Sequence, residues 1–413
     1  MLLRSLCVDS YRNLAAADIP FSDGINLLYG QNAAGKTNTL ECIYLFASGR
    51  SFRTRHEIDF IRRGEEYATA SIHFCREAAQ TVGQTAPYTE QMSLCWKKDT
   101  GRRLVKKMLY QGCETPRASE FLGIFRAVLF TPEHLSLIKG SPEERRRFTD
   151  IALSQLAPRY VRCMNDYLKI LSQKNAYLKK AAVSGRPDEA YLDVLDTQLA
   201  SFGAVLIRQR RAFVAHIQKH AARFYTALTD SREALAVEYL SSGLRRVEEA
   251  DDIEGQLYAV FRADRASDLK FGRTLHGPHK DDLAIFIADR LSDTDNRLFE
   301  SAPTSEEADE HGEPQLTLSE FAARTFASQG QQRSAVLALK LAEGELFREL
   351  TGEYPVFLFD DLFGELDAFR RERLLALLED RQVIISCCDR SALPKAPAHT
   401  LCVTDGVVRP DKA

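Results

Sequence analysis

The sequence predicts an α/β protein in which a discontinuous nucleotide-binding lobe carries an inserted α-helical lobe. Three observations predict this fold. A glycine-rich loop between an apolar run and a helix-period segment lies near the start of the chain, at 30–37. An apolar strand that ends in two carboxylates lies near the end of the chain, at 356–361. The middle has apolar residues at helical spacing, some in the steps of three and four that are typical of a short coiled-coil hairpin.

The first motif has the pattern of a phosphate loop, G-x-x-x-x-G-K-T. Its residues are Gly30, Gln31, Asn32, Ala33, Ala34, Gly35, Lys36 and Thr37, and Asn38 follows. A strand before the loop and a helix after it are the context that this motif requires. Inward-facing N–H groups and the helix N-terminus attract phosphate oxygens, so we expect these nine residues to bind a nucleoside triphosphate. Lys36 is expected to act catalytically at the β- and γ-phosphates and Thr37 to ligate Mg²⁺; the alternative is a chance glycine-rich turn.

The second motif is the strand that ends in an acid pair, Asp360 and Asp361. A buried parallel strand is a continuous apolar run, and ligands bind at the carboxyl ends of strands in open α/β sheets. We therefore expect Asp360 to hold Mg²⁺ and Asp361 to polarise the attacking water as the catalytic base. The alternative for Asp361 is a loop or capping carboxylate. Ser386 ends the next apolar run, where we expect it to contact the γ-phosphate.

The third motif implies a pair of subunits. Ser328, Gly330 and Gln331 come directly before a helix-period segment, and a hydroxyl, a glycine and a helix N-terminus together make a second anion site. In the ATP-binding-cassette class such a segment caps the nucleotide of the partner subunit, so we expect these residues to bind ATP across an ATP-dependent homodimer. The alternative is a plain helix N-cap.

Further stretches carry a family resemblance. They are Tyr11-Arg12-Asn13, the run from Thr131 to Asp150, the run from His276 to Leu283, and the run from Phe359 to Asp367. Together with the three motifs, in the same order and over nearly the whole chain, they resemble the RecF family, the bacterial recombination-repair members of the SMC/Rad50-like ATPases. The resemblance implies an ABC-type P-loop ATPase head with an inserted helical lobe.

The resemblance also implies a function. It implies a cytoplasmic recombination mediator that uses ATP and Mg²⁺, dimerises on ATP, hydrolyses it weakly, and binds duplex or gapped DNA without sequence preference. It implies action in DNA repair and replication restart, where the protein would help to load recombinase at single-strand gaps with the partner RecR. The chain departs from the family pattern at Thr149 and Gly364, has no Gln near Thr131–Glu133, and has Ser386 where transporter ATPases carry a γ-phosphate-sensing His. The γ-phosphate sensor is therefore unassigned.

The motif positions predict four segments along the chain. Residues 1–140 form the N-terminal part of the ATPase lobe and residues 350–413 its C-terminal part. Residues 141–265 form the helical arm, which begins at a capping box, Ser141-Pro142-Glu143-Glu144, and is interrupted at Pro158 and at 184–188. Residues 266–349 complete the second lobe and contain the third motif. The arm is too short for a long rod, which disfavours a structural SMC-type tether.

Composition excludes some classes of protein. Nine cysteines without a C-x-x-C pair predict reduced thiols. No apolar run approaches the roughly 20 residues of a membrane span, so we expect no membrane contact; the rival function, the ATPase subunit of a membrane transporter, is also disfavoured by the helical arm. The net charge is -3, but 293–313 holds eight acids and one base, so the rest of the chain is net positive. We interpret that acidic stretch as a surface insertion.

Candidate DNA contacts are the basic residues of the arm and the ATPase lobe, because phosphate contacts need positive charge and no sequence readout. For each of them a solvated helix face is the alternative, and for 145–147 it is pairing with nearby acids. The candidates are Arg53, Arg55, Arg62, Arg63, Arg145, Arg146, Arg147, Lys179, Lys180, Arg208, Arg210, Arg211, Lys219 and Arg223.

Overall fold

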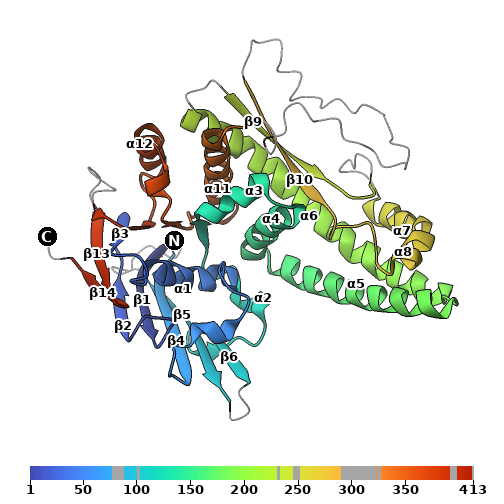
Figure 1. The fold of residues 1–413 in the computed structure, drawn as a ribbon, viewed down its shortest axis with the longest axis horizontal. Coiled ribbons are helices and arrows are strands. Elements are labelled where there is room, and N and C mark those ends of the chain that lie inside the picture. Colours follow the sequence, from blue (N-terminus) through green and yellow to red (C-terminus); the bar gives the residue numbers. More distant parts are fainter. Residues whose placement is uncertain are drawn as a thin grey trace. The chain divides into compact units, whose positions relative to one another are not determined.

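The computed structural model describes residues 1–76, 88–99, 103–229, 233–244, 252–289, 323, 327–390 and 398–411. The chain divides into two compact units (Figure 1). The first unit contains Met1–His134, Ala227–Asp230 and Val336–Ala413, and the second contains Leu135–Thr226 and Ser231–Ala335. The predicted α/β class is confirmed, with one lobe built from both ends of the chain and a helical insert between them. The acidic stretch Asp293–Glu313 lies outside the described residues.

The first unit contains a six-stranded sheet that holds the nucleotide motifs. Its order is β14 (Val407–Pro410), β13 (Ala398–Thr404), β3 (Ile25–Tyr29), β12 (Val383–Cys387), β11 (Val356–Asp360) and β8 (Ala127–Phe130). All neighbours except β13 and β14 are parallel. Every residue of β8, β11 and β12 is buried, as expected for parallel strands covered on both faces. The carboxyl ends of β3, β11 and β12 therefore meet at one edge.

A second sheet of the first unit is antiparallel throughout. Its order is β2 (Ala17–Pro20), β1 (Leu2–Asp9), β4 (Tyr67–Cys75), β5 (Thr89–Lys98), β6 (Leu104–Tyr110) and β7 (Cys113–Glu114). Helix α1 (Lys36–Ser48) contacts β8, β11 and β12 of the first sheet and β4 of the second. This position between two sheets explains why α1 is buried on nearly all sides. Two further helices of this unit are α2 (Ala118–Phe121) and α12 (Ala368–Leu377).

The second unit is mainly helical. Its helices are α3 (Ser136–Lys139), α4 (Pro142–Leu156), α5 (Pro158–Ser184), α6 (Glu189–Thr229), α7 (Ile253–Ala263) and α8 (Arg265–Phe271), and α11 (Gln329–Thr351) begins here. Strands β9 (Glu233–Leu240) and β10 (Asp282–Asp289) form an antiparallel pair. The predicted breaks at Pro158 and 184–188 are confirmed, and α5 and α6 run side by side as a hairpin (Figure 1). Helix α4 begins after Ser141 as predicted, but the Ser141 side chain makes no capping hydrogen bond.

Helix α6, with 41 residues, is the longest helix of the described residues. It contains an 18-residue window of mean hydropathy 1.3, so by length and composition it is the one helix of the described residues that passes the test for a membrane span. The expectation that no uninterrupted apolar run approaches that length stands, because charged residues such as Asp193, Asp196 and Arg208 interrupt the apolar sequence of the helix. Half of the window is buried inside the structure, and the core helices of soluble proteins pass the same test. The helix is therefore weak evidence for a membrane.

Candidate nucleotide-binding site

The glycine-rich loop joins β3 to α1 and surrounds the ammonium group of Lys36. Lys36 Nζ donates hydrogen bonds to the backbone oxygens of Gly30 (2.7 Å) and Gln31 (3.0 Å). Gly30 has a φ of +156°, and a Cβ at this position would lie 2.2 Å from the backbone oxygen of Val403. A side chain at position 30 would therefore displace the loop from the neighbouring strand β13.

The start of α1 is held by residues near the N-terminus. The Asn13 side chain donates to the Ala33 backbone oxygen (3.1 Å) and accepts from the Asn38 side chain (2.7 Å). Beside it, Arg12 makes two hydrogen bonds, of 2.8 and 3.0 Å, to the fully buried carboxylate of Glu41 on α1. This bidentate ion pair is strong and directional. Residues 11–13, which the sequence analysis named only for their family resemblance, thus stabilise the phosphate loop and the start of α1.

The acid pair lies at the carboxyl end of β11. Asp360 Oδ1 accepts hydrogen bonds from Thr37 Oγ1 (2.9 Å) and Ser386 Oγ (2.7 Å), and Ser386 Oγ accepts from the Asp361 backbone N–H (3.0 Å). The structure thus brings together Thr37 and Asp360, the two residues expected to hold Mg²⁺. Ser386 is fully buried and donates its one proton to Asp360. In this structure the hydrogen bonds of Ser386 fix the acid pair, and its contact with a γ-phosphate stays a prediction.

The two carboxylates have different surroundings. Asp360 is 7% exposed, whereas Asp361 is exposed and has a φ of +51°, a left-handed conformation that aspartate tolerates. Burial raises the pKa of Asp360; hydrogen bonds from Ser386 and Thr37 oppose that shift, and the negative charges of Asp361 and Glu133 add to it. Glu133 is an acid that sequence reasoning did not assign to this site. A cation here would be stabilised by the concentration of negative charge.

These residues fit a magnesium ion that is shared with a nucleotide. Within the described residues, no group of three or more His, Cys, Asp or Glu side chains is placed to hold a metal by itself. Mg²⁺ is commonly held by one or two protein oxygens and completes its octahedron with phosphates and water. The Thr37 hydroxyl and the Asp360 carboxylate, already in contact, are suitable protein ligands.

Cys388 is a further residue of this edge that the sequence did not single out. Its Sγ donates to the Asn32 side chain at 2.9 Å and lies 3.9 Å from Asp361 Oδ1. It links the phosphate loop to the acid pair, although 356 positions separate it from Asn32. Its neighbour Cys387 is buried, and burial raises the pKa of that thiol to about 11. All nine cysteines are free thiols, as predicted.

Ser328, Gly330 and Gln331 belong to the second unit and lie at the start of α11. Ser328 is exposed, and its Oγ accepts from the Gln331 backbone N–H (3.2 Å), while Gln331 Oε1 accepts from the Ser328 backbone N–H (2.6 Å). This reciprocal pair is a capping box. The simpler interpretation of the segment, a helix N-cap, therefore describes its local structure, and it leaves Ser328 on the surface.

Three of the basic residues that were candidates for DNA contact instead bind groups of the second unit itself. Arg210 is 3% exposed, pairs with Asp150 (2.8 Å) and donates to the Pro278 backbone oxygen (2.6 Å). Arg145 is 6% exposed and forms a bidentate pair with Asp282 at 2.7 and 2.8 Å. Arg146 donates to the Asp281 backbone oxygen (2.6 Å). The expectation that Arg210 and Arg145 meet DNA is therefore wrong, because burial and ion pairing commit both guanidinium groups to the fold.

The His276–Leu283 segment is also a structural element. The ring of His279 makes hydrogen bonds with Tyr167 Oη (2.8 Å) and the Thr274 backbone oxygen (3.2 Å). Burial lowers the pKa of His279 to about 4, so the ring is neutral at physiological pH. Asp281 is buried and accepts from the Ser242 backbone N–H at 2.7 Å. This segment therefore joins α5 to the β9–β10 pair.

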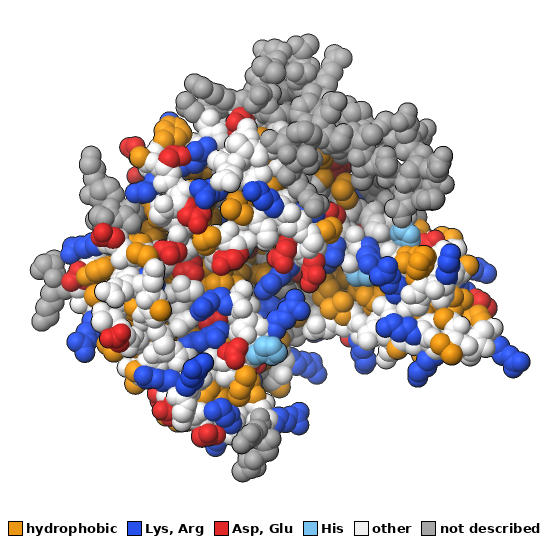
Figure 2. Space-filling model, viewed as in Figure 1, with side chains coloured by type: hydrophobic (Ala, Val, Ile, Leu, Met, Phe, Trp, Pro, Cys, Tyr) orange, Lys and Arg blue, Asp and Glu red, His pale blue; other side chains and the backbone are white. Residues whose placement is uncertain are grey.

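The remaining basic candidates lie at the surface. On the face shown in Figure 2, Lys and Arg side chains are spread over both units and are intermixed with acidic side chains. Exposed candidates include Arg53, Arg63, Lys179, Lys180, Arg208 and Lys219. Arg208 and Lys219 lie eleven residues apart on α6, about three helical turns, and so occupy the same side of that helix.

Comparisons with known proteins found one matching family model and relatives that match most or all of the chain. The family model RecF/RecN/SMC N terminal domain matches residues 2–406. A protein of Lacticaseibacillus casei named DNA replication and repair protein RecF is 35% identical over 384 residues, which cover 92% of this chain and 91% of the relative. A protein of the same name from Pediococcus pentosaceus is 32% identical over 417 residues, with both chains covered completely.

Solved structures show the same fold. The recombination mediator protein RecF-ATPrS in the RecFOR pathway superposes with a TM-score of 0.82 at 30% identity, over 99% of this chain and 98% of the other. The structure of RecF-ATP in that pathway gives a TM-score of 0.81 at 29% identity, over 100% and 98% of the two chains. An Smc head bound to the C-winged helix domain of ScpA gives a TM-score of 0.52 at 16% identity and is similar in fold alone.

Proposed function

Because the chain belongs to the RecF family of DNA replication and repair proteins, we propose that it is an ATP-dependent DNA-binding recombination mediator. ATP with Mg²⁺ binds at the phosphate loop and closes two subunits into a dimer, and slow hydrolysis reopens them. The closed dimer holds duplex or gapped DNA and helps to load recombinase at single-strand gaps in repair and replication restart.

The observation that carries this proposal is the contact between Thr37 and Asp360. A hydroxyl at the start of α1 and a carboxylate at the end of β11 are joined by one hydrogen bond of 2.9 Å, directly beside the loop that surrounds Lys36. This arrangement supports a site for the triphosphate and its metal ion. Asp361 follows on the exposed side, where we propose that it polarises the attacking water.

Dimerisation is supported by the chemistry of the second unit. Ser328 is an exposed hydroxyl at the N-terminus of α11, a 23-residue helix, and its segment suits a phosphate supplied from outside. We propose that Ser328, Gly330 and Gln331 complete the nucleotide site of a partner subunit. The relatives named RecF-ATP and RecF-ATPrS support ATP as the nucleotide.

The same relatives support the proposed partners. They are recombination mediators of the RecFOR pathway, and we propose that this chain likewise acts with RecR, and through it with the recombinase-loading machinery, in the cytoplasm. A membrane transporter subunit is a weaker candidate, because relatives covering the whole chain are DNA replication and repair proteins. A structural tether is also weaker, because α5 has 27 residues and the hairpin that it forms with α6 is therefore too short for a long rod.

The test is the affinity for a duplex with a single-strand gap, measured over a salt series with ATP, with ADP and without nucleotide. Of these three nucleotide states, we expect tight DNA binding only in the presence of ATP. We expect that binding to fall steeply with salt, because phosphate contacts release counterions, and to depend little on sequence. Equal, salt-insensitive affinity in all three states would show that ATP does not gate DNA contact.

A pair of surface variants locates the DNA contacts. Neutralising Arg208 and Lys219 by Arg208→Gln and Lys219→Gln should flatten the plot of log affinity against log salt, by about 0.9 for each phosphate that the variant no longer neutralises. The matched control neutralises two exposed bases of the first unit, Lys107 and Arg117, whose side chains are 56% and 72% exposed. If the salt dependence of DNA binding is unchanged in the Arg208→Gln, Lys219→Gln variant, DNA does not contact this side of α6.

A further inference from the structure

The capping box at the start of α11 is tied to two other elements of the second unit. The amide group of Gln331 is engaged at both ends: its oxygen accepts from the Ser328 backbone N–H, and its nitrogen donates to Glu233 Oε1 at 2.9 Å. Glu233 is the first residue of β9, and its other oxygen accepts from the hydroxyl of Tyr225 at 2.6 Å. Tyr225 is fully buried near the end of α6.

Strand β9 is itself fixed to α6 by a second side chain. Gln218 donates to the Leu235 backbone oxygen (3.3 Å) and accepts from the Val237 backbone N–H (2.5 Å). The carboxylate of Glu233 therefore has a defined position, set by its own strand and by Tyr225. A continuous chain of hydrogen bonds runs from α6 through Glu233 and Gln331 to Ser328.

We propose that Glu233 and Tyr225 are positioning residues that orient Ser328, through Gln331, toward the nucleotide of a partner subunit. The inference rests on the proposed function, in which Ser328 contacts that nucleotide. It extends the site to two residues outside the nucleotide motifs, one at the end of the arm helix and one on β9.

The chemistry of Glu233 explains why an acid is placed here. The two ends of a glutamine amide have nearly the same shape, and only their hydrogen-bond partners decide which way the group points. An ionised carboxylate only accepts hydrogen bonds, so Glu233 turns the nitrogen of Gln331 toward itself. The oxygen of Gln331 must then face the Ser328 backbone N–H.

This orientation prepares the Ser328 hydroxyl for a phosphate. Its oxygen accepts from the Gln331 backbone N–H, and a hydroxyl has one proton to donate. With the oxygen held by the cap, that proton can point out of the subunit. Holding a donor in place before the ligand arrives lowers the entropic cost of binding, so loss of Glu233 should weaken ATP-driven association and leave the phosphate loop untouched.

The experiment is a double-mutant cycle on the full chain. The ATP concentration that gives half-maximal dimerisation is measured by sedimentation for the wild type, Glu233→Ala, Ser328→Ala and the double variant. We expect Glu233→Ala to raise that concentration about tenfold, the effect of losing one hydrogen bond to a charged group. If Glu233 acts through Ser328, adding Glu233→Ala to Ser328→Ala should change the half-maximal ATP concentration little.

Three controls separate positioning from damage to the fold. Glu238→Ala changes an acid on the opposite face of the same strand and should leave dimerisation unchanged. Glu233→Gln should dimerise at nearly the wild-type ATP concentration, because its amide oxygen can still accept a hydrogen bond from Gln331. Affinity for ADP, which depends on the phosphate loop alone, should be equal in every variant.

The outcomes separate the inference from the proposed function. A wild-type protein that does not associate with ATP would contradict the proposed function. If the wild type associates and Ser328→Ala weakens it, but Glu233→Ala has no effect or an equal effect in both backgrounds, the positioning role is refuted. Non-additive losses together with unchanged ADP affinity would establish it.

Discussion

At the scale of single residues, the acid pair shows how neighbouring carboxylates acquire different chemistry. Asp360 ends a fully buried strand and accepts hydrogen bonds from two hydroxyls, Thr37 and Ser386. Asp361 follows with a left-handed backbone and an exposed side chain. The first suits a fixed metal ligand, and the second suits a group that contacts water.

This difference predicts opposite defects. Asp361→Asn should still bind ATP with Mg²⁺, but should turn over at least about a hundredfold more slowly, the lower range for losing a general base. The closed dimer should then persist. Asp360→Asn should instead weaken binding of the metal-bound nucleotide, measured by titration with and without Mg²⁺. Glu365→Gln, an exposed acid of the following turn, is the matched control. Turnover at the wild-type rate in Asp361→Asn would place the base elsewhere.

The sequence predicted the motif residues of this site but not their connectors. A phosphate loop and an apolar strand with two acids are local patterns, so they can be recognised without a fold. Ser386 was expected near the γ-phosphate, but its hydrogen bonds to the acid pair, like the contact of Cys388 with Asn32, depend on the register in which β12 pairs with β3 and β11. Glu233 contacts Gln331 across 98 positions of the chain. The residues adjacent in the sequence give no pattern from which such long-range contacts could be predicted.

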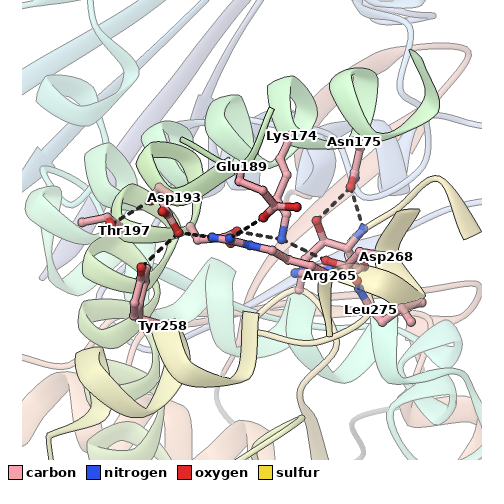
Figure 3. Close-up of polar contacts among 12 residues, drawn as sticks. Lys174, Asn175, Glu189, Asp193, Thr197, Tyr258, Arg265, Asp268 and Leu275 are labelled. Atoms are coloured by element: carbon pink, nitrogen blue, oxygen red, sulfur yellow. Dashed lines mark hydrogen bonds and ion pairs between the residues drawn. The ribbon is translucent and has the colours of Figure 1, made fainter. Parts of the chain in front are cut away.

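At the scale of elements, a buried ion network holds the helical arm together (Figure 3). Lys174 of α5 is fully buried between Asp196 of α6 (2.8 Å) and Asp268 of α8 (2.9 Å). Arg265 also pairs with Asp196 at 2.9 Å and with Asp193. Three helices thus meet at paired charges, and Asp268 also accepts a hydrogen bond from the Leu275 backbone N–H (2.9 Å). Buried charges of this kind are costly to leave unpaired.

Removing the central cation should therefore be severe. Lys174→Met should lower the free energy of unfolding by about 3–5 kcal/mol, because it leaves the buried carboxylate of Asp268 without its cation and Asp196 with Arg265 as its remaining cation. Lys179→Met, an exposed lysine on the same helix, should cost less than about 0.5 kcal/mol. Adding Asp268→Asn to Lys174→Met should restore part of the loss by removing one buried charge. Denaturant unfolding measures all three, and a small effect in Lys174→Met would contradict a structural role.

The limits of sequence reasoning are also clear at this scale. Helix boundaries at Pro158 and 184–188 were predictable, because proline and glycine end helices for local steric reasons. The orientation of charged residues was not. Arg208, Arg210 and Arg211 form a basic run that is typical of a nucleic-acid contact, yet Arg210 turns inward to Asp150 and Pro278. Only packing decides which residues of such a run face water.

At the scale of the whole molecule, each unit carries one part of the proposed nucleotide site. The phosphate loop and the acid pair belong to the first unit, and the segment around Ser328 belongs to the second. In a symmetric dimer the same two surfaces meet twice. We therefore propose two composite sites, each with the loop of one subunit and the Ser328 segment of the other.

Mixing two inactive variants tests this arrangement directly. Lys36→Met removes the cation of the loop, and Ser328→Arg blocks the segment that faces the partner, so each variant alone should lack ATP-driven dimerisation and turnover. In a mixed dimer, the loop of the Ser328→Arg subunit faces the intact segment of the Lys36→Met subunit, while the other site carries both defects. With random pairing at equal amounts, about a quarter of wild-type sites should be restored.

The measurement is ATP turnover and sedimentation of each variant alone and of their mixture, at constant total protein. The Ser328→Arg protein should keep the wild-type affinity for ADP, which shows that its loop is intact. The Lys36→Met chain has an intact Ser328 segment but a defective loop, and the Ser328→Arg chain has the reverse. Recovery in the mixture therefore requires a site that combines the loop of one chain with the Ser328 segment of the other. If the mixture stays as inactive as its components while both proteins remain folded, the site belongs to a single chain and the composite arrangement is wrong.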